Sequence, residues 1–164
     1  MSVAIAKLVV TVSAEDLDEM NHVNNVVYMR WMEMAAREGS AQAGWPTERY
    51  FREGIAAWVV RKHWIEYLRE CRLGDTVEIY TWVQDFVANM SLRRYAMKVN
   101  GKLCCTAATE WAFVDLKTRR LGQVPEAVTS AFELVPEGDE RLKALGIAQP
   151  VRYLPTAMRT AHEA

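Results

Sequence analysis

The segment from Asp16 to Trp31 concentrates the side chains of this chain that could do chemistry. Carboxylates, amides and an imidazole fill its first ten residues, and an apolar helix is predicted to follow from Asn25. The first backbone N–H groups of a helix have no partner within it, and the helix dipole favours negative charge there. A carboxylate beside such amides combines a base with an oxyanion site, which acyl-transfer chemistry needs.

Asp18 is the first candidate for a catalytic base or nucleophile in this segment. A structural role is also open to it, because an acidic side chain before a helix commonly caps the first turn. Asp16 or Asn21 could provide that cap as well as Asp18. The residues alone therefore leave both roles open.

The same segment resembles the hotdog-fold thioesterases. It is similar to the motif of the plant-type acyl-carrier-protein thioesterases at Asp16-Leu17-Asp18, His22-Val23-Asn24-Asn25, Tyr28 and Trp31. The spacing from Asp18 to Tyr28 is also similar to that of the 4-hydroxybenzoyl-CoA thioesterase branch. The resemblance implies that Asp18 is the catalytic carboxylate and that the backbone amide of Asn25 polarises the thioester carbonyl. It also makes Tyr28 a candidate substrate contact.

The plant-type resemblance adds His22 and Glu70 as catalytic candidates. Residues 65–71 are similar to a strand motif of that family in which a Glu and the following Cys lie near the active site. Met20 departs from the pattern, because the family has an Asn there, and this departure favours a simpler mechanism of one carboxylate and an oxyanion site. Without the family, His22 would be a packed or solvated side chain, Glu70 a surface charge, and Cys71 a packing residue.

Two basic clusters could bind the phosphates of CoA or of a phosphopantetheine arm. They are Arg93-Arg94 and residues 117–120. Such clusters are more often solvated charges on strands and turns. The tryptophan and methionine side chains could likewise line an acyl tunnel, although a place in the core explains most of them.

Changes in hydrophobic period predict the strands that position these residues. Residues 3–13 are rich in Val and Ile and should form a first strand, not a signal peptide or a membrane span. After Ile55, turn signals divide the chain into strands at 56–70, 76–84, 91–99 and 102–115. Asn100-Gly101 between the last two predicts a type I′ hairpin.

Three helices are expected around these strands. The first runs from Asn25 to near Gly39 and carries polar side chains only along the narrow stripe of Arg30, Glu33 and Arg37, which predicts burial on most sides. Shorter helices are predicted between residues 45 and 54 and between residues 125 and 134.

This order of elements predicts an α+β fold with a helix on one face of an antiparallel sheet. The resemblance implies the hotdog fold, with about five strands wrapped around a long central helix. It also implies a homodimer or tetramer in which protomers join their sheets edge to edge and active sites lie between subunits. We expect the domain to span residues 1–136, and residues 137–164 to form an extension of uncertain order.

Composition excludes several other classes of function. With 164 residues, 51% of them hydrophobic and a net charge of -1, the chain should fold as one domain with no general attraction to nucleic acid or membrane. Three cysteines suit a reducing, cytoplasmic setting. The three histidines are too scattered for a metal site, and no serine nucleophile elbow, phosphate loop or dinucleotide fingerprint occurs, so no cofactor is expected.

We therefore expect a thioesterase that hydrolyses an acyl-CoA or acyl-carrier-protein thioester, as in fatty acid metabolism. The carboxylate of Asp18 would activate water or attack the carbonyl directly. The alternative is a non-catalytic protein of the same fold that binds acyl thioesters or acts as a scaffold. A dehydratase is a weaker possibility, because the residues after His22 lack the Gly/Pro-rich stretch of those enzymes.

Overall fold

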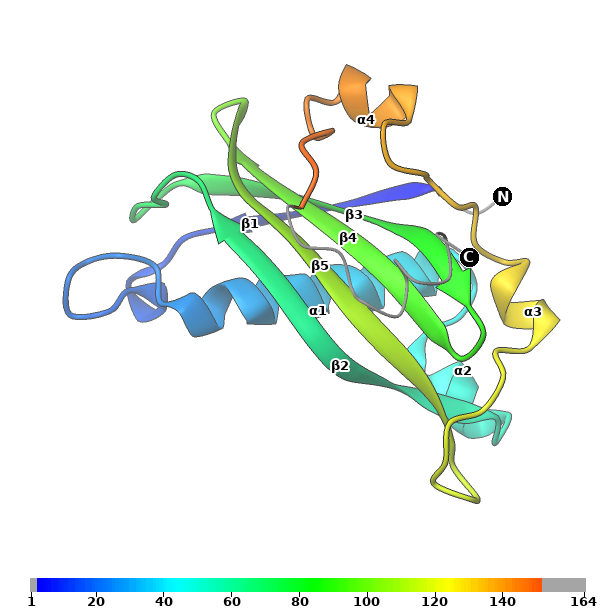
Figure 1. Ribbon diagram of the computed structural model, residues 1–164. Helices are drawn as coiled ribbons and strands as arrows, with labels where there is room; N and C mark the ends of the chain where they lie inside the picture. The colour runs from blue at the N-terminus through cyan, green and yellow to red at the C-terminus, as the bar shows by residue number, and fades with distance from the viewer. Residues whose placement is uncertain (1–2, 152–164) are drawn as a thin grey trace.

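The fold is a curved antiparallel sheet with one long helix lying along its inner face (Figure 1). The structure is a computed structural model, and it describes residues 3–151. Five strands pair in the order β1-β3-β4-β5-β2. Their bounds are Ile5–Thr11 (β1), Ala56–Tyr67 (β2), Thr76–Val87 (β3), Met90–Val99 (β4) and Lys102–Asp115 (β5). This arrangement confirms the predicted α+β hotdog architecture, with β1 and β2 at the two sheet edges.

The hairpin between β4 and β5 forms at the position that the sequence predicts. Asn100 and Gly101 have φ angles of 52° and 75°, and Val99 pairs with Lys102 across the turn. Two successive positive φ angles are the requirement of a type I′ turn. The turn sets the register of the first two pairs, and the pairing then shifts by one residue between Met97 and Lys98.

The long helix α1 spans Asn25–Gln42 and extends past the predicted end at Gly39. Shorter helices follow at Thr47–Arg52 (α2), Glu126–Thr129 (α3) and Glu140–Ala144 (α4), and a 3₁₀ turn spans Ala14–Asp16. The predicted helix at 125–134 is wrong beyond Thr129. The chain leaves the helix there because the Val135 N–H donates to the Val83 carbonyl of β3, which holds the segment against the sheet.

The expectation that α1 is buried on most sides is wrong for the single chain. Its inner face, which includes Trp31 and Met32, packs in the main core against the sheet. Val26, Met29 and Met34 remain exposed, with 55%, 38% and 42% of their surfaces accessible. One curved sheet covers only one side of a helix, so the outer apolar side chains of α1 have no cover within the described chain.

The outer face of the sheet is covered in part by the segment that follows α3. Leu142 and Ile147 are buried there against Trp82 and Ala96. Residues 137–151 are therefore packed on the sheet, while the rest of the predicted extension, residues 152–164, lies outside the described residues. The boundary of the domain at residue 136 stays a prediction.

Candidate functional site

The loop that carries Asp18 is closed by its own backbone. Leu17 and Val23 form an isolated antiparallel bridge, and the Asp18 N–H donates to the His22 carbonyl at 2.8 Å. Oδ1 of Asp18 accepts the N–H groups of Met20 and His22 at 2.9 and 3.1 Å. These bonds fix the position of a partly exposed carboxylate. They go to the loop and not to α1, so Asp18 does not cap the helix.

Asn24 is the residue that caps α1. Its Oδ1 atom accepts the Val26 N–H at 3.1 Å, and its carbonyl accepts the Val27 N–H. The Asn24 N–H in turn donates to the Asp16 carbonyl at 2.9 Å, which ties the loop to the helix. Asn25 is the first residue of α1, and its N–H is one of the donors that have no acceptor inside the helix.

His22 and Glu70 meet at the side of this loop. Nε2 of His22 lies 3.0 Å from Oε1 of Glu70, with 49% and 41% of the two side chains exposed. Glu70 follows β2, and the N–H groups of Leu68 and Arg69 just before it donate to the carbonyl of Cys104 in β5. The structure thus brings together three of the four predicted catalytic residues through the Asp18 loop.

Tyr28 and Cys71 lie beneath this group in the core. Tyr28 is 4% exposed, and its ring packs edge-on against Trp31 and Tyr67. Burial, followed by a hydrogen bond with Cys71, raises the pKa of Tyr28. A hydrogen bond with the Cys104 thiol, 3.5 Å away, lowers the pKa of Cys71 to about 7 against the effect of burial. Tyr28 therefore packs in the core and is not among the residues that line the cavity described next.

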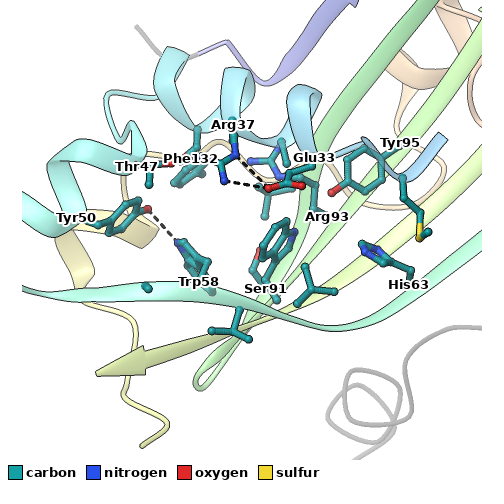
Figure 2. Close-up of a pocket in the computed structure, with 18 of the residues that line it drawn as sticks. Glu33, Arg37, Thr47, Tyr50, Trp58, His63, Ser91, Arg93, Tyr95 and Phe132 are labelled. Atoms are coloured by element: carbon teal, nitrogen blue, oxygen red, sulfur yellow. Dashed lines mark hydrogen bonds and ion pairs between the residues drawn. The ribbon is translucent and has the colours of Figure 1, made fainter. Parts of the chain in front are cut away.

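A cavity of about 710 Å³ lies between the outer side of α1, helix α2 and the sheet (Figure 2). It starts at Val26, the residue after Asn25, and continues past Glu33 and Arg37 to Tyr50 in α2. Aromatic side chains form much of its wall, from Tyr50, Trp58, Phe86, Tyr95, Trp111 and Phe132. Asp18 does not line the cavity within the described chain, whereas the first turn of α1 does.

Arg93 and Arg94 lie on opposite faces of the sheet, and the expectation that they bind phosphates stays a prediction. Successive residues of a strand face opposite sides of the sheet. Arg93 lines the cavity on the α1 side. Arg94 lies over Trp82 on the other side, where it donates to Gln84 and to the carbonyl of Gln149. Both are buried, with 6% and 3% of their surfaces exposed, so they are not solvated strand charges.

His63 and Tyr95 line the same cavity and were not singled out from the sequence, whereas Trp58 and Trp111 are among the tryptophans considered for an acyl tunnel. Nδ1 of His63 lies 2.8 Å from the hydroxyl oxygen of Thr109 on the neighbouring strand. The period-two pattern of β4, which places Ser91, Arg93 and Tyr95 on one face, was a usable signal for part of this wall.

Residues 3–151 lack two further features, a membrane-spanning helix and a metal site. Residues 3–151 hold no helix that is both long and apolar enough to cross a membrane. Nor does this part of the chain gather three or more His, Cys, Asp or Glu side chains in a group that could hold a metal ion.

Comparison with known proteins gives a family and several relatives. A family model described as the thioesterase-like superfamily matches residues 12–132. An acyl-[acyl-carrier-protein] hydrolase of Cuphea viscosissima is 37% identical over 81 residues, which cover 48% of this chain and 19% of that protein. A palmitoyl-acyl carrier protein thioesterase of Cuphea hookeriana is 34% identical over 52% of this chain and 21% of its own length. The chain thus spans about a fifth of these relatives.

Solved structures share the fold at low sequence identity. A 1,4-dihydroxy-2-naphthoyl-CoA thioesterase from Synechocystis superposes with a TM-score of 0.71 at 15% identity, over 77% of this chain and 94% of that one. A putative oleoyl thioesterase from Lactobacillus plantarum gives a TM-score of 0.75 at 16% identity, over 92% of this chain and 55% of that one.

Proposed function

Since the chain belongs to the thioesterase-like superfamily, we propose that it hydrolyses acyl thioesters of coenzyme A or of an acyl-carrier protein. The observation that carries the proposal is the family match over residues 12–132, which include the Asp18 loop, α1 and the strands β2 to β5. Curated relatives from two Cuphea species are hydrolases of acyl-carrier-protein thioesters, which supports an acyl thioester as the substrate.

The amino end of α1 is the proposed oxyanion site. The thioester carbonyl would accept the N–H of Asn25, which is free of intrahelical partners and lies at the positive end of an 18-residue helix. An oxyanion donor of this kind is worth a few kcal/mol, or about 10²–10³ in rate. Because the donor is a backbone group, the side chain at position 25 matters less than the start of the helix.

Asp18 is the proposed base or nucleophile. Both of its side-chain hydrogen bonds within the described residues go to Oδ1, so Oδ2 is left for a water molecule or a carbonyl carbon. The two loop amides stabilise the charged carboxylate and hold it in one orientation. His22 and Glu70 are proposed as supporting residues, since they fix the outer side of the same loop.

The cavity along α1 is the proposed acyl site. It begins at Val26, directly after the oxyanion donor, and its wall is largely aromatic and aliphatic. A volume of about 710 Å³ is within the range of small-molecule sites. The acyl chain of a substrate whose thioester carbonyl lies at Asn25 would therefore extend along α1 toward α2.

We also propose a homodimer that joins through the β2 edge, with a tetramer as its possible further assembly. β2 is an edge strand with exposed Val59 and Val60, and Val26 and Met29 of α1 are exposed beside the same cavity. A partner at this edge would cover the outer side of α1 and could bring its own Asp18 loop to the cavity. Light scattering of the purified protein tests this assembly.

The second candidate is a protein of the same fold that binds acyl thioesters without hydrolysing them. It is favoured by one observation: Glu33 is the sole carboxylate that lines the cavity within the described chain, and Arg37 holds it at 2.9 Å. Such a protein would bind acyl-CoA and release no thiol.

A thiol-release assay on a panel of acyl-CoA and acyl-carrier-protein thioesters separates the two. Turnover of any member above the buffer rate, together with its loss in Asp18→Asn, supports the hydrolase. Saturable binding of acyl-CoA with no thiol released from any member supports the binding protein.

A further inference from the structure

Arg93 is a buried cation that has no acidic partner among residues 3–151. Its side chain lines the cavity and only 6% of the residue is exposed. Within the described residues its guanidinium makes one hydrogen bond, from Nη1 to the Thr81 hydroxyl at 3.1 Å, and no ion pair. Burial lowers its pKa, and the nearby Tyr95 and Tyr50 oppose that shift. A guanidinium has five donors, so most of its hydrogen-bonding capacity is unused.

Helix α1 is shaped to admit this guanidinium. Gly39 lies inside the helix, and a Cβ atom at that position would stand 2.8 Å from Nη1 of Arg93. Glycine is disfavoured in a helix interior relative to alanine. Glycine at position 39 therefore lowers the stability of the helix, but it leaves space for the Arg93 guanidinium beside the carboxyl-terminal half of α1.

Two further polar groups lie in the same wall without a charged partner in the described part of the chain. The Tyr95 hydroxyl and Nε1 of Trp111 are buried, and within the described chain the Tyr95 hydroxyl has only neutral neighbours for hydrogen bonds, namely Thr109 and Trp111. Both residues line the cavity, and Tyr95 is only 1% exposed. Burial raises the pKa of Tyr95 against the influence of Arg93, so its hydroxyl keeps its proton and remains a donor. A carboxylate in the cavity would offer this phenol and indole a charged acceptor, which forms stronger hydrogen bonds than their neutral neighbours do.

The charge of the cavity favours an anion as that ligand. Three arginines and one glutamate line it, and the glutamate, Glu33, is already bound by Arg37. A carboxylate, like a phosphate, matches a guanidinium in shape, and its two oxygens can also accept from a phenol and an indole. Of the two anions we consider the carboxylate, because it can end an acyl chain.

We propose that Arg93, Tyr95 and Trp111 form a subsite that binds a carboxylate at the distal end of the acyl group. The acyl part rests on the proposed thioesterase function. With a rise of about 1.5 Å per residue, Gly39 lies about 21 Å along α1 from Asn25. The anion would therefore sit far from the thioester, which selects a long acyl chain with a terminal carboxylate over a short one.

Binding of free acids tests the subsite without any turnover. The probes are decanoate and its uncharged matches, decanol and methyl decanoate, measured by isothermal titration calorimetry. We expect decanoate to bind roughly tenfold tighter than decanol, and Arg93→Gln to abolish this difference. Tyr95→Phe, which keeps the ring, should reduce the ratio of the decanoate affinity to the decanol affinity by about threefold to tenfold.

Arg94→Gln is the matched control. It removes a buried guanidinium from the same strand, but from the opposite face and away from the cavity. The acid-to-alcohol ratio of Arg94→Gln should equal that of the unmodified protein. Circular dichroism shows whether each variant is folded, and Tyr95→Phe carries the test if Arg93→Gln is not.

Matched thioesters test the selectivity. The half-thioesters of CoA with hexanedioic to hexadecanedioic acid are compared with the acyl-CoAs of equal length by kcat/KM. A preference for the long carboxylated acyl groups that disappears in Arg93→Gln supports the proposal. An acid preference in calorimetry without turnover of any thioester keeps the subsite and overturns the proposed function. Equal binding of decanoate and decanol, or a preference unchanged in Arg93→Gln and Tyr95→Phe, overturns the subsite.

Discussion

Nε2 of His22 and Oε1 of Glu70 lie 3.0 Å apart, although 48 positions separate them in the sequence. This contact connects the loop that holds Asp18 to the chain segment that leaves β2. Because both side chains are more than two-fifths exposed, the pair itself contributes at most about 1 kcal/mol to folding. The contact also holds the loop in position, since the backbone N–H of the same His22 donates to Oδ1 of Asp18.

The first prediction concerns this pair. His22→Ala and Glu70→Gln should each lower kcat/KM by about tenfold or less. The loss in the double variant should be no larger than the larger of the two single losses, because the two residues act through one contact. Thiol-release kinetics on the three variants check this. Independent, multiplicative losses would show that the residues act separately, and a loss in His22→Ala as large as that in Asp18→Asn would favour a full plant-type network.

The second prediction separates the two sides of α1. Met32 is fully buried against the sheet, and Met34, two residues later, is 42% exposed. Met32→Ala should lower the free energy of unfolding by about 2–5 kcal/mol through lost packing and a cavity. Met34→Ala should change it by about 0.5 kcal/mol or less in dilute protein. Urea unfolding at one protein concentration measures both, and equal effects would mean that the outer side of α1 is covered as firmly as the inner one.

The elements that form by local rules could be predicted from the sequence. The alternation of side chains and the Asn100-Gly101 turn are properties of a few neighbouring residues, so they predict the β4–β5 hairpin, although not the register shift between Met97 and Lys98. The start of α1 at Asn25 was also predicted, although the residue that caps it is Asn24 and not Asp16, Asp18 or Asn21. Errors occur where tertiary contacts decide, as at Val135, whose bond to β3 ends the expected third helix early.

The candidate site was only partly within reach of the sequence. The family resemblance made His22 and Glu70 catalytic candidates, but their direct contact was not predicted, because no local pattern joins a loop to a distant strand end. The opposite directions of Arg93 and Arg94 follow from strand geometry once β4 is recognised. The burial of Arg93 beside Gly39 did not follow, because it depends on how closely α1 lies on the sheet.

The third prediction concerns pH. Desolvation lowers the pKa of His63 from its ordinary value of 6.5, against the charge of Glu33. His63 therefore takes up a proton less readily in the folded protein than in the unfolded chain. The contribution of neutral His63 to the free energy of unfolding is complete above pH 6.5, and it is lost as the pH falls from 6.5 through the lowered pKa. His63→Gln has no such loss. The Tm of the unmodified protein minus the Tm of the variant should therefore decrease as the pH falls below 6.5. An increase of this signed difference on acidification would contradict the assignment.

The role of Asp18 is tested most directly by Asp18→Asn, with Glu19→Gln as its control. The asparagine oxygen can still accept the N–H groups of Met20 and His22, so the loop keeps its shape while the charge is removed. Glu19 is the neighbouring exposed carboxylate.

Asp18→Asn should lower kcat on the best thioester at least about a hundredfold, as expected for loss of a general base, with an unchanged Tm and an unchanged mass by light scattering. Glu19→Gln should retain full activity. A loss of less than about tenfold in a folded Asp18→Asn protein would contradict the account and move the catalytic role to another residue.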